Sequence, residues 1–219
     1  MANSPSSVLG ELIRISKLGP DGKILTGANS VYTFKEFISF SFTPEYEDGD
    51  EFTQKNAKGG VCVTYKAPDT LKRLNLSVAI CNPDPVVESL LGGGEILADG
   101  DSSNPIGWSS PAVGEDPVPN GVAIEVWSHA VTDGKQDANT PYFHWIFPYA
   151  KLRQSGERVI QNDILATEFE GWAVGNLPFG SGPAAPYWGF PVLSDRPYSY
   201  ARVGSQLPTA GWTTATPQV

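Results

Sequence analysis

The sequence predicts an all-β domain, a sandwich or barrel with one short helix and long loops. Several segments alternate apolar and polar residues with the two-residue period of a half-buried strand, most cleanly Ile38–Thr43 and Leu74–Ile80. The 219 residues include 23 glycines and 19 prolines, which are typical of many strands joined by turns. Only one segment carries both a helix start signal and a helix stop signal.

The length and charge limit the possible classes of protein. A chain of 219 residues suits one domain with additions, and a core that buries roughly 70% of the unfolded surface is feasible at this size. The net charge of −9 argues against a surface that binds the phosphates of nucleic acid. The N-terminus has no signal-peptide pattern, and no apolar run approaches the roughly 20 residues that span a bilayer. We therefore expect a protein without a membrane span that is made in a cytoplasm.

In the N-terminal part, residues 1–10 form an expected loose arm and Glu11–Leu18 the first strand. A second strand covers Ile38–Thr43, and Val61–Tyr65 is expected to return beside it as a hairpin. Alternation in the second strand places apolar residues on one face and hydroxyl residues on the other. The apolar face holds Ile38, Phe40 and Phe42, and the polar face holds Ser39, Ser41 and Thr43.

The loop of this hairpin is unusually long and strongly charged. A two-residue turn would join the strands, and loops longer than about 12–15 residues in compact domains are usually functional or disordered. The segment is either a solvated acidic tip or an extension that reaches another molecule. Its charged residues are five carboxylates followed by two lysines: Glu45, Glu47, Asp48, Asp50 and Glu51, then Lys55 and Lys58.

The only predicted helix follows Asp84, which can cap it, and starts at Pro85. The glycines 92–94 end it, because glycine readily adopts the left-handed conformation. Further strands are predicted at Val122–His129, Tyr142–Phe147 and Ile164–Val174. The last of these places Leu165 and Phe169 on one face and Glu168 and Glu170 on the other.

The composition changes after residue 175. Seven of the 19 prolines fall within residues 176–219, and no strand or helix period survives there. The segment is too aromatic for a simple disordered tail. We therefore expect an extended arm that docks on a surface, either of this chain or of a neighbour. The arm's contacts are assigned to its aromatic residues Trp188, Phe190, Tyr198, Tyr200 and Trp212.

The sequence offers no assembled active site. The two histidines, His129 and His144, lack further residues at the spacing of a zinc site. Glu168 and Glu170 could form a glycosidase pair, but paired carboxylates are common on solvated strand faces. Cys62 and Cys81 lie in apolar strands and are expected to be buried free thiols. We expect no enzyme activity, no cofactor and no metal.

Several segments together resemble the major tail tube proteins of long, non-contractile-tailed phages, and specifically those of phages that infect actinobacteria. The resemblance covers residues 10–178, which places a tail tube β-domain at residues 11–175. Its strongest part is the acidic loop with Asn56–Cys62 and the Leu74–Ile80 strand. Further support comes from the segments Asp84-Pro85 with its helix, Gly121–Trp127 and Gly171–Asn176.

The resemblance implies a subunit of hexameric rings that stack into a tube in the virion. One sheet of each subunit would join its neighbours in a closed β-barrel around the lumen. The tube would house the tape measure protein, conduct DNA at infection and end against tail terminator and distal tail proteins. The long hairpin loop would contact the next ring.

A conduit for DNA should not bind it, because each neutralised phosphate adds affinity. Ser39, Ser41 and Thr43 offer an uncharged polar face, and Glu168 and Glu170 offer an acidic one, so both are expected to face the lumen. Their opposite faces should then be core, which predicts burial of the apolar residues Ile38, Phe40, Phe42, Leu165 and Phe169.

Two other functions agree with the same composition. A monomeric β-sandwich that binds carbohydrate or protein would also be rich in aromatics and turns, and it should expose an aromatic platform such as Trp188 or Trp212. A glycoside hydrolase built on Glu168 and Glu170 is the less favoured alternative.

Overall fold

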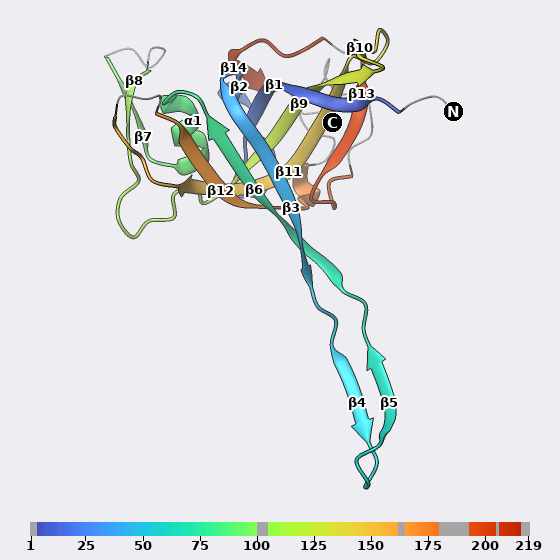
Figure 1. Cartoon of the computed structure of the whole chain (residues 1–219). Helices are drawn as coiled ribbons and strands as arrows, with labels where there is room; N and C mark the ends of the chain where they lie inside the picture. The colour runs from blue at the N-terminus through green and yellow to red at the C-terminus, as the bar shows by residue number, and fades with distance from the viewer. Residues whose placement is uncertain (1–3, 100–104, 162–164, 180–192, 205, 216–219) are drawn as a thin grey trace.

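A computed structural model describes residues 4–99, 105–161, 165–179, 193–204 and 206–215, and it contains one ten-stranded antiparallel sheet. The strand order is β14-β2-β1-β9-β11-β12-β6-β3, with β10 beside β9 and β13 beside β11 (Figure 1). Strands make up 57% of the residues that the structure describes, which confirms the all-β prediction. The strands of this sheet are β1 (Ser6–Lys17), β2 (Gly27–Phe34), β3 (Phe37–Glu47), β6 (Thr70–Ile80), β9 (Val122–Thr132), β10 (Lys135–Gln136), β11 (Tyr142–Ser155), β12 (Thr167–Val174), β13 (Ser199–Val203) and β14 (Gly211–Ala215).

The sheet curls so that one face becomes the inside of a barrel-like body. β3 and β6 cross in front of β9 and β11 in Figure 1. Side chains from both sides meet inside: the rings of Phe40 and Phe147 lie 5.1 Å apart, and those of Phe42 and Trp145 5.7 Å apart. The fully buried members of this main core include Ile15, Val78 and Phe169. Apolar burial of this kind is the main stabilising contribution to the fold.

Helix α1 (Pro85–Gly92) packs against this core with Val87 and Leu91, and it has the predicted ends. Asp84 Oδ1 accepts hydrogen bonds from the backbone N–H groups of Val86 and Val87, at 2.8 and 3.3 Å. Gly93 ends the helix with a φ of 74°, a conformation that favours glycine. The helix prediction is therefore confirmed.

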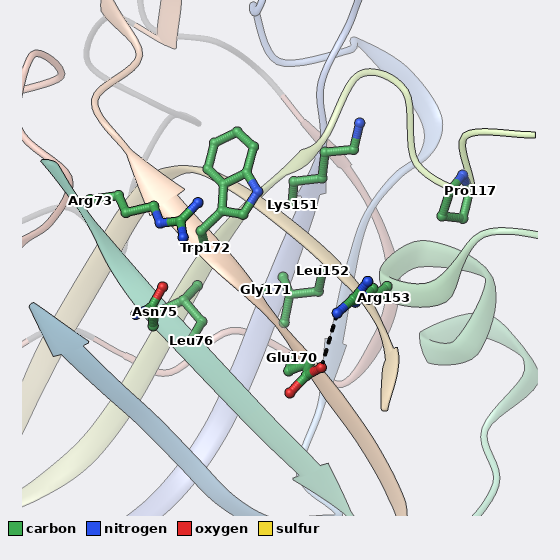
Figure 2. A pocket seen from close by; sticks show the side chains of 10 residues that line it. All are labelled: Arg73, Asn75, Leu76, Pro117, Lys151, Leu152, Arg153, Glu170, Gly171 and Trp172. Atoms are coloured by element: carbon green, nitrogen blue, oxygen red, sulfur yellow. Dashed lines mark hydrogen bonds and ion pairs between the residues drawn. The ribbon is translucent and has the colours of Figure 1, made fainter. Parts of the chain in front are cut away.

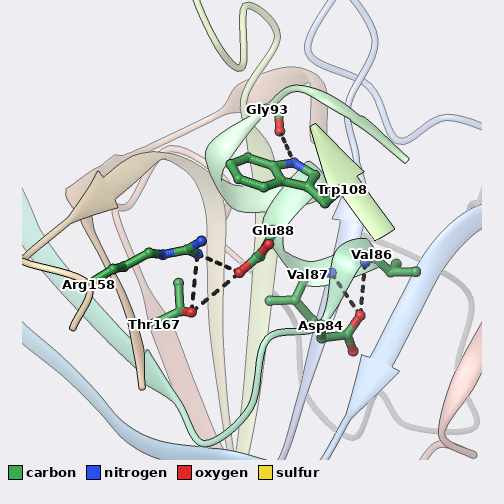
Figure 3. Close-up of polar contacts among 8 residues, drawn as sticks. All are labelled: Asp84, Val86, Val87, Glu88, Gly93, Trp108, Arg158 and Thr167. Atoms are coloured by element: carbon green, nitrogen blue, oxygen red, sulfur yellow. Dashed lines mark hydrogen bonds and ion pairs between the residues drawn. The ribbon is translucent and has the colours of Figure 1, made fainter. Parts of the chain in front are cut away.

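A polar cluster attaches the helix to neighbouring segments (Figure 3). The buried Glu88 accepts hydrogen bonds from Arg158 Nη2 at 2.5 Å and Thr167 Oγ1 at 3.3 Å. Trp108 belongs to the small hairpin of β7 (Glu95–Ala98) and β8 (Pro105–Ser109), and its Nε1 donates to the Gly93 carbonyl at 2.8 Å. Each buried polar group in this cluster thus has a partner, as burial requires.

The outer face of β1, β9 and the first half of β11 is covered by the C-terminal segment of the same chain. The 3₁₀ helix η1 (Leu177–Phe179) and strand β14 bring Phe179 and Ala215 against Leu18 and Ile146. β13 lies beside the first half of β11 and β14 beside β2. The predicted arm therefore docks on its own chain wherever the structure describes it.

The aromatic residues assigned to the arm have different environments. Tyr198 is half-buried, with its ring 5.2 Å from Phe42, and the half-buried Trp212 lies 5.1 Å from Tyr32. Tyr200 stacks on Trp145 at 4.4 Å and stays 53% exposed. Trp188 and Phe190 lie outside the described residues.

A buried ionic network lies under this C-terminal cover. Arg14 Nη2 donates to Glu125 Oε1 at 2.6 Å, and His144 Nε2 lies 3.0 Å from the same oxygen. The His144 ring also stacks on Trp127 at 3.9 Å. Burial raises the pKa of the Glu125 carboxyl, but the Arg14 charge and the hydrogen bonds from His144 and Arg14 outweigh it, so this pKa lies below its usual value.

Several strand boundaries and one pairing differ from the sequence prediction. β1 begins at Ser6, within the predicted N-terminal arm, and β11 continues to Ser155. The prediction that Val61–Tyr65 pairs with the strand at Ile38–Thr43 is wrong: β3 pairs with β6 instead. Alternation shows which residues share a face, but it does not reveal the partner strand.

The predicted burial of Ile38 is also wrong, since it is 58% exposed. Phe37 pairs with Ile80 and Ser39 with Ala79, so Ile38 is the extra residue of a β-bulge and is turned outward. Phe40, Phe42 and Leu165 are half-buried, and Phe169 is fully buried. The two cysteines are not buried as predicted, because Cys62 is exposed on a projecting strand and Cys81 is half-buried at the end of β6.

Truncation of Phe169 should test the position of the main core. Phe169→Ala removes a fully buried ring and should lower the free energy of unfolding by roughly 3–5 kcal/mol. Phe52→Ala, at a side chain that is 61% exposed, is the matched control and should change it by less than about 0.5 kcal/mol. Urea unfolding of the unassembled protein measures the free energy of unfolding of both variants. An equal loss of this free energy in both would contradict the position of Phe169 in the core.

The network of Glu125 should make the fold sensitive to acid. Because the folded state lowers the pKa of Glu125, its stabilising contribution is complete above the unfolded value of about 4.5 and is lost as pH falls below it. Glu125→Gln should lower stability at pH 7 by roughly 3–5 kcal/mol, since Arg14 stays buried without its counter-charge. It should also flatten the loss of stability below pH 5 in thermal unfolding. The control Glu45→Gln, at the protein surface, should leave most of the acid-induced loss of stability unchanged.

Candidate functional site

A hairpin arm projects far from the body of the molecule (Figure 1). It consists of β4 (Glu51–Lys55) and β5 (Val61–Lys66), which continue outward from the ends of β3 and β6, and every residue of both strands is exposed. The predicted long loop therefore contains the outer end of β3 and the whole of β4, and the predicted strand at Val61–Tyr65 pairs with β4. The sequence analysis did not predict β4 because the acidic residues before Phe52 interrupt the alternation of apolar and polar residues.

The arm has defined geometry both at its waist (residues 47–50 and 67–69), where β3 and β6 give way to β4 and β5, and at its tip (residues 53–64). At the waist, the Gly49 N–H donates to Asp69 Oδ1 at 3.0 Å, and a Cβ at Gly49 would lie only 2.0 Å from the Ala67 carbonyl oxygen. At the tip, Asn56 Oδ1 accepts from the N–H groups of Lys58 and Gly60, at 3.0 and 2.9 Å. Side-chain acceptors of this kind fix a turn.

One face of the arm carries apolar side chains with no core beneath them. Phe52 lies directly opposite Tyr65, and Gln54 lies opposite Val63, so Phe52, Val63 and Tyr65 share a face. These three side chains are 57–61% exposed. A lone two-stranded hairpin is marginally stable in water, and contiguous exposed apolar side chains mark interaction surfaces. The arm therefore has the features of a contact surface for another molecule.

The charges of the arm are partly balanced within the chain. Arg73 Nε donates to Glu45 Oε2 at 2.7 Å and Lys72 lies 3.3 Å from the other oxygen, and these contacts, Arg73 first, lower the pKa of Glu45. Glu51 faces Lys66 across the strand pair. The tip beyond Phe52 contains Lys55 and Lys58 and no carboxylate. Glu47, Asp48 and Asp50 lie at the waist.

The five residues predicted to face a lumen lie on one exposed face of the sheet. Ser39 and Glu168 are both paired with Ala79, and Ser41 and Glu170 are both paired with Ser77. Thr43 lies in the next row, opposite Asn75. The structure thus brings together the outer faces of β3, β6 and β12. We refer to this surface, with the outer face of the second half of β11 that carries Lys151 and Arg153, as the polar face.

Three basic residues that the sequence analysis missed also lie on or beside the polar face, and each has a carboxylate partner. Arg153 Nη2 lies 3.3 Å from Glu170 Oε1, and Lys151 Nζ lies 2.5 Å from Asp116 Oδ2. Arg73 pairs with Glu45, as described above. The polar face is therefore charge-balanced rather than acidic. The alternation of charged and apolar residues in Lys151-Leu152-Arg153 would have placed Lys151 and Arg153 on the outer face of their strand.

A shallow depression of about 490 Å³ lies on the polar face, between Arg73, Lys151 and Trp172 (Figure 2). Its only carboxylate among the lining residues is Glu170, which Arg153 contacts. A glycosidase needs a second carboxyl group that holds its proton in the same cleft. Glu168 does not line the depression and is exposed. The geometry thus gives no support to the hydrolase alternative.

The remaining groups considered from the sequence have structural partners. His129 Nε2 lies 3.1 Å from Glu11 Oε2, and His144 contacts Glu125. No cluster of three or more His, Cys, Asp or Glu side chains suited to a metal occurs in the part of the chain that the structure describes. No helix in that part has the length and apolar character needed to cross a membrane.

Trp212 does not form the exposed platform expected of a carbohydrate-binding module. It packs on Tyr32, and Lys17 Nζ lies 4.7 Å from its ring centroid. The other candidate, Trp188, lies outside the described residues.

Comparison with other proteins gives weak similarities only. No family model matches the sequence, and no curated protein matches it. One similar solved structure is a chain of the PVC sheath–tube complex, an extracellular contractile injection system in its extended state. It is 13% identical, with 77% of this chain and 87% of that chain covered and a TM-score of 0.30. Another is a chain of the anti-feeding prophage (AFP) baseplate, 12% identical, with coverages of 79% and 93% and a TM-score of 0.30. Values this low assign no function.

Proposed function

We propose that this chain is the structural subunit of a phage tail tube, which assembles into stacked hexameric rings. The observation that carries the proposal is the hairpin arm: an ordered ribbon, exposed on all sides, with an apolar face that its own chain does not cover. Such an arm gains stability only when a second molecule covers that face.

Lateral assembly of a ring follows from the edges of the sheet. Within the described residues, β3 and β14 end the strand order, so each has one edge without a strand partner. Unpaired edges invite strand pairing between molecules, and a closed barrel removes them. The resemblance noted in the sequence agrees with this arrangement, since it implies a barrel closed by one sheet from each subunit.

The polar face supplies a suitable lining for a DNA channel. Its hydroxyl residues, Ser39, Ser41 and Thr43, are uncharged, and Arg153 and Lys151 each have a carboxylate within hydrogen-bonding or ion-pair distance. A cation that is already paired offers little affinity to a passing phosphate. A tube lined in this way would hold the tape measure protein before infection and conduct DNA without binding it. The other partners in this proposal are the tail terminator and distal tail proteins of the virion.

Purified protein should assemble into rings or tubes without a metal or cofactor. Glu47→Ala/Asp48→Ala/Asp50→Ala, at the waist of the arm, should leave the fold intact, because exposed loop charges rarely change stability by more than about 0.5 kcal/mol. It should nevertheless shorten the tubes or slow their growth. Electron microscopy and size-exclusion chromatography over a range of concentrations measure this. A strictly monomeric protein at high concentration would instead favour a binding module.

Removal of the carboxylate partners should make the polar face bind DNA. Asp116→Asn/Glu170→Gln leaves Lys151 and Arg153 unpaired. Assembled tubes of this variant should then retain far more duplex DNA at about 50 mM salt than at about 200 mM, because binding through phosphates weakens steeply with salt concentration. Glu95→Gln/Glu115→Gln removes the same charge elsewhere and is the matched control. Equal DNA retention by both double variants would show that the polar face does not line the channel.

A further inference from the structure

Two β-bulges turn apolar side chains outward at the end of the body opposite the arm. In β1, the pairing with β9 shifts between Val8 and Gly10, and the extra residue Leu9 is 78% exposed with a φ of +51°. In β3, the shift between Phe37 and Ser39 exposes Ile38, as described above. Bulges are devices that re-aim a side chain, and a positive φ is unfavourable for leucine.

The two outward side chains line the same groove. A cavity of about 310 Å³ lies between β1 and β3, and its lining includes Val8, Leu9, Phe37, Ile38 and Trp145. The Phe37 ring occupies the space beside Gly10, where a Cβ would lie only 2.3 Å from a ring carbon. The structure therefore maintains a groove with a strained rim, in which these apolar side chains lie beside the serines Ser7, Ser39 and Ser128. We call it the bulge groove.

We propose that the bulge groove receives the apolar face of the hairpin arm from a second copy of this chain. This inference rests on the proposed function and names the surface on which the arm would stack. The positions of the two surfaces support the hairpin arm as the segment that fills the groove. Ile38 is the second residue of β3, and the arm continues from the other end of β3, roughly 30 Å from Ile38. Copies displaced along β3 would thus bring the arm of one over the groove of the next.

The symmetry of such a contact agrees with a tube. The two surfaces differ and lie at opposite ends of one molecule, so the contact is heterologous. Copies related by displacement along β3, rather than by a closing rotation, form an open series. Each copy would offer one arm and one groove, which gives stacking without a limit on length. An isologous contact between two arms would stop at a pair.

The chemistry of the two surfaces is complementary. Phe52 on the arm is an aromatic side chain of a size suited to the groove, where Trp145 and Phe37 offer aromatic partners. The tip next to Phe52 carries Lys55 and Lys58. Glu11, which follows Gly10, is already paired with Lys35 at 3.2 Å, and Glu36 lines a different cavity. The residues that line the groove are themselves uncharged, so the two lysines of the tip meet no like charge in its lining.

A disulfide between two populations of the protein tests the contact directly. Both carry Cys62→Ser/Cys81→Ser; one also carries Phe52→Cys and the other Ile38→Cys. After mixing, assembly and mild oxidation, we expect a cross-linked dimer in the mixture and little in either population alone. The matched control replaces Ile38→Cys with Ile106→Cys, a residue of β8 that is 64% exposed.

The outcomes separate this inference from the proposed function. Tubes that form normally with no more cross-link at position 38 than at position 106 would overturn the groove assignment and leave the tube proposal standing. Cross-linking of the Phe52→Cys population with itself would show that arms pair with arms, and would also overturn it. Failure of the parent protein to assemble at all would overturn both.

Leu9→Gly provides a second test that does not depend on cross-linking. Glycine tolerates the positive φ, so the variant should melt no lower than the parent and, in this size class, up to a few degrees higher, roughly 2–4 °C. Loss of the leucine side chain from the contact should slow assembly about tenfold. Unchanged assembly with the same or higher melting temperature would contradict a role for this rim in stacking.

Discussion

The antiparallel pairing of β3 with β6 determines where the functional surfaces of this protein lie. The same two strands close the barrel-like body at one end and continue into the projecting arm at the other. Because side chains alternate across a strand, this single register assigns Phe40 and Phe42 to the inside and the hydroxyl residues between them to the polar face. A shift by one residue would exchange these faces and leave the molecule without either surface.

The body gives this strand pair a rigid support. Helix α1 is attached through Glu88, and the C-terminal segment covers the outer face of β1, β9 and the first half of β11 above the Arg14–Glu125–His144 network. A buried ionic network of this kind tolerates no loss of one partner, because the other charge would remain buried. The firmly packed elements thus lie away from the arm, and the surfaces left open are the arm, the bulge groove and the polar face.

These three surfaces suit two different contacts. The arm and the bulge groove both expose apolar side chains and lie at opposite ends of β3, as expected of surfaces that meet in repeated head-to-tail contacts. The polar face is wet and charge-balanced, as expected of a surface that should not retain a polyanion. The bulge groove depends on local irregularities, namely the bulges at Leu9 and Ile38, rather than on regular strand geometry alone.

The sequence by itself determined the all-β class, helix α1 with its Asp84 cap, and the grouping of Ser39, Ser41 and Thr43 on one face and of Glu168 and Glu170 on another. These features depend on short-range periodicity and capping, which a few neighbouring residues specify. Only the tertiary structure decided that these faces join, that Arg153 and Lys151 lie beside them with carboxylate partners, and that Ile38 points outward. Strand partners, bulges and cross-strand ion pairs depend on residues distant in the chain, and the pattern of one strand contains no information about which strand will lie beside it.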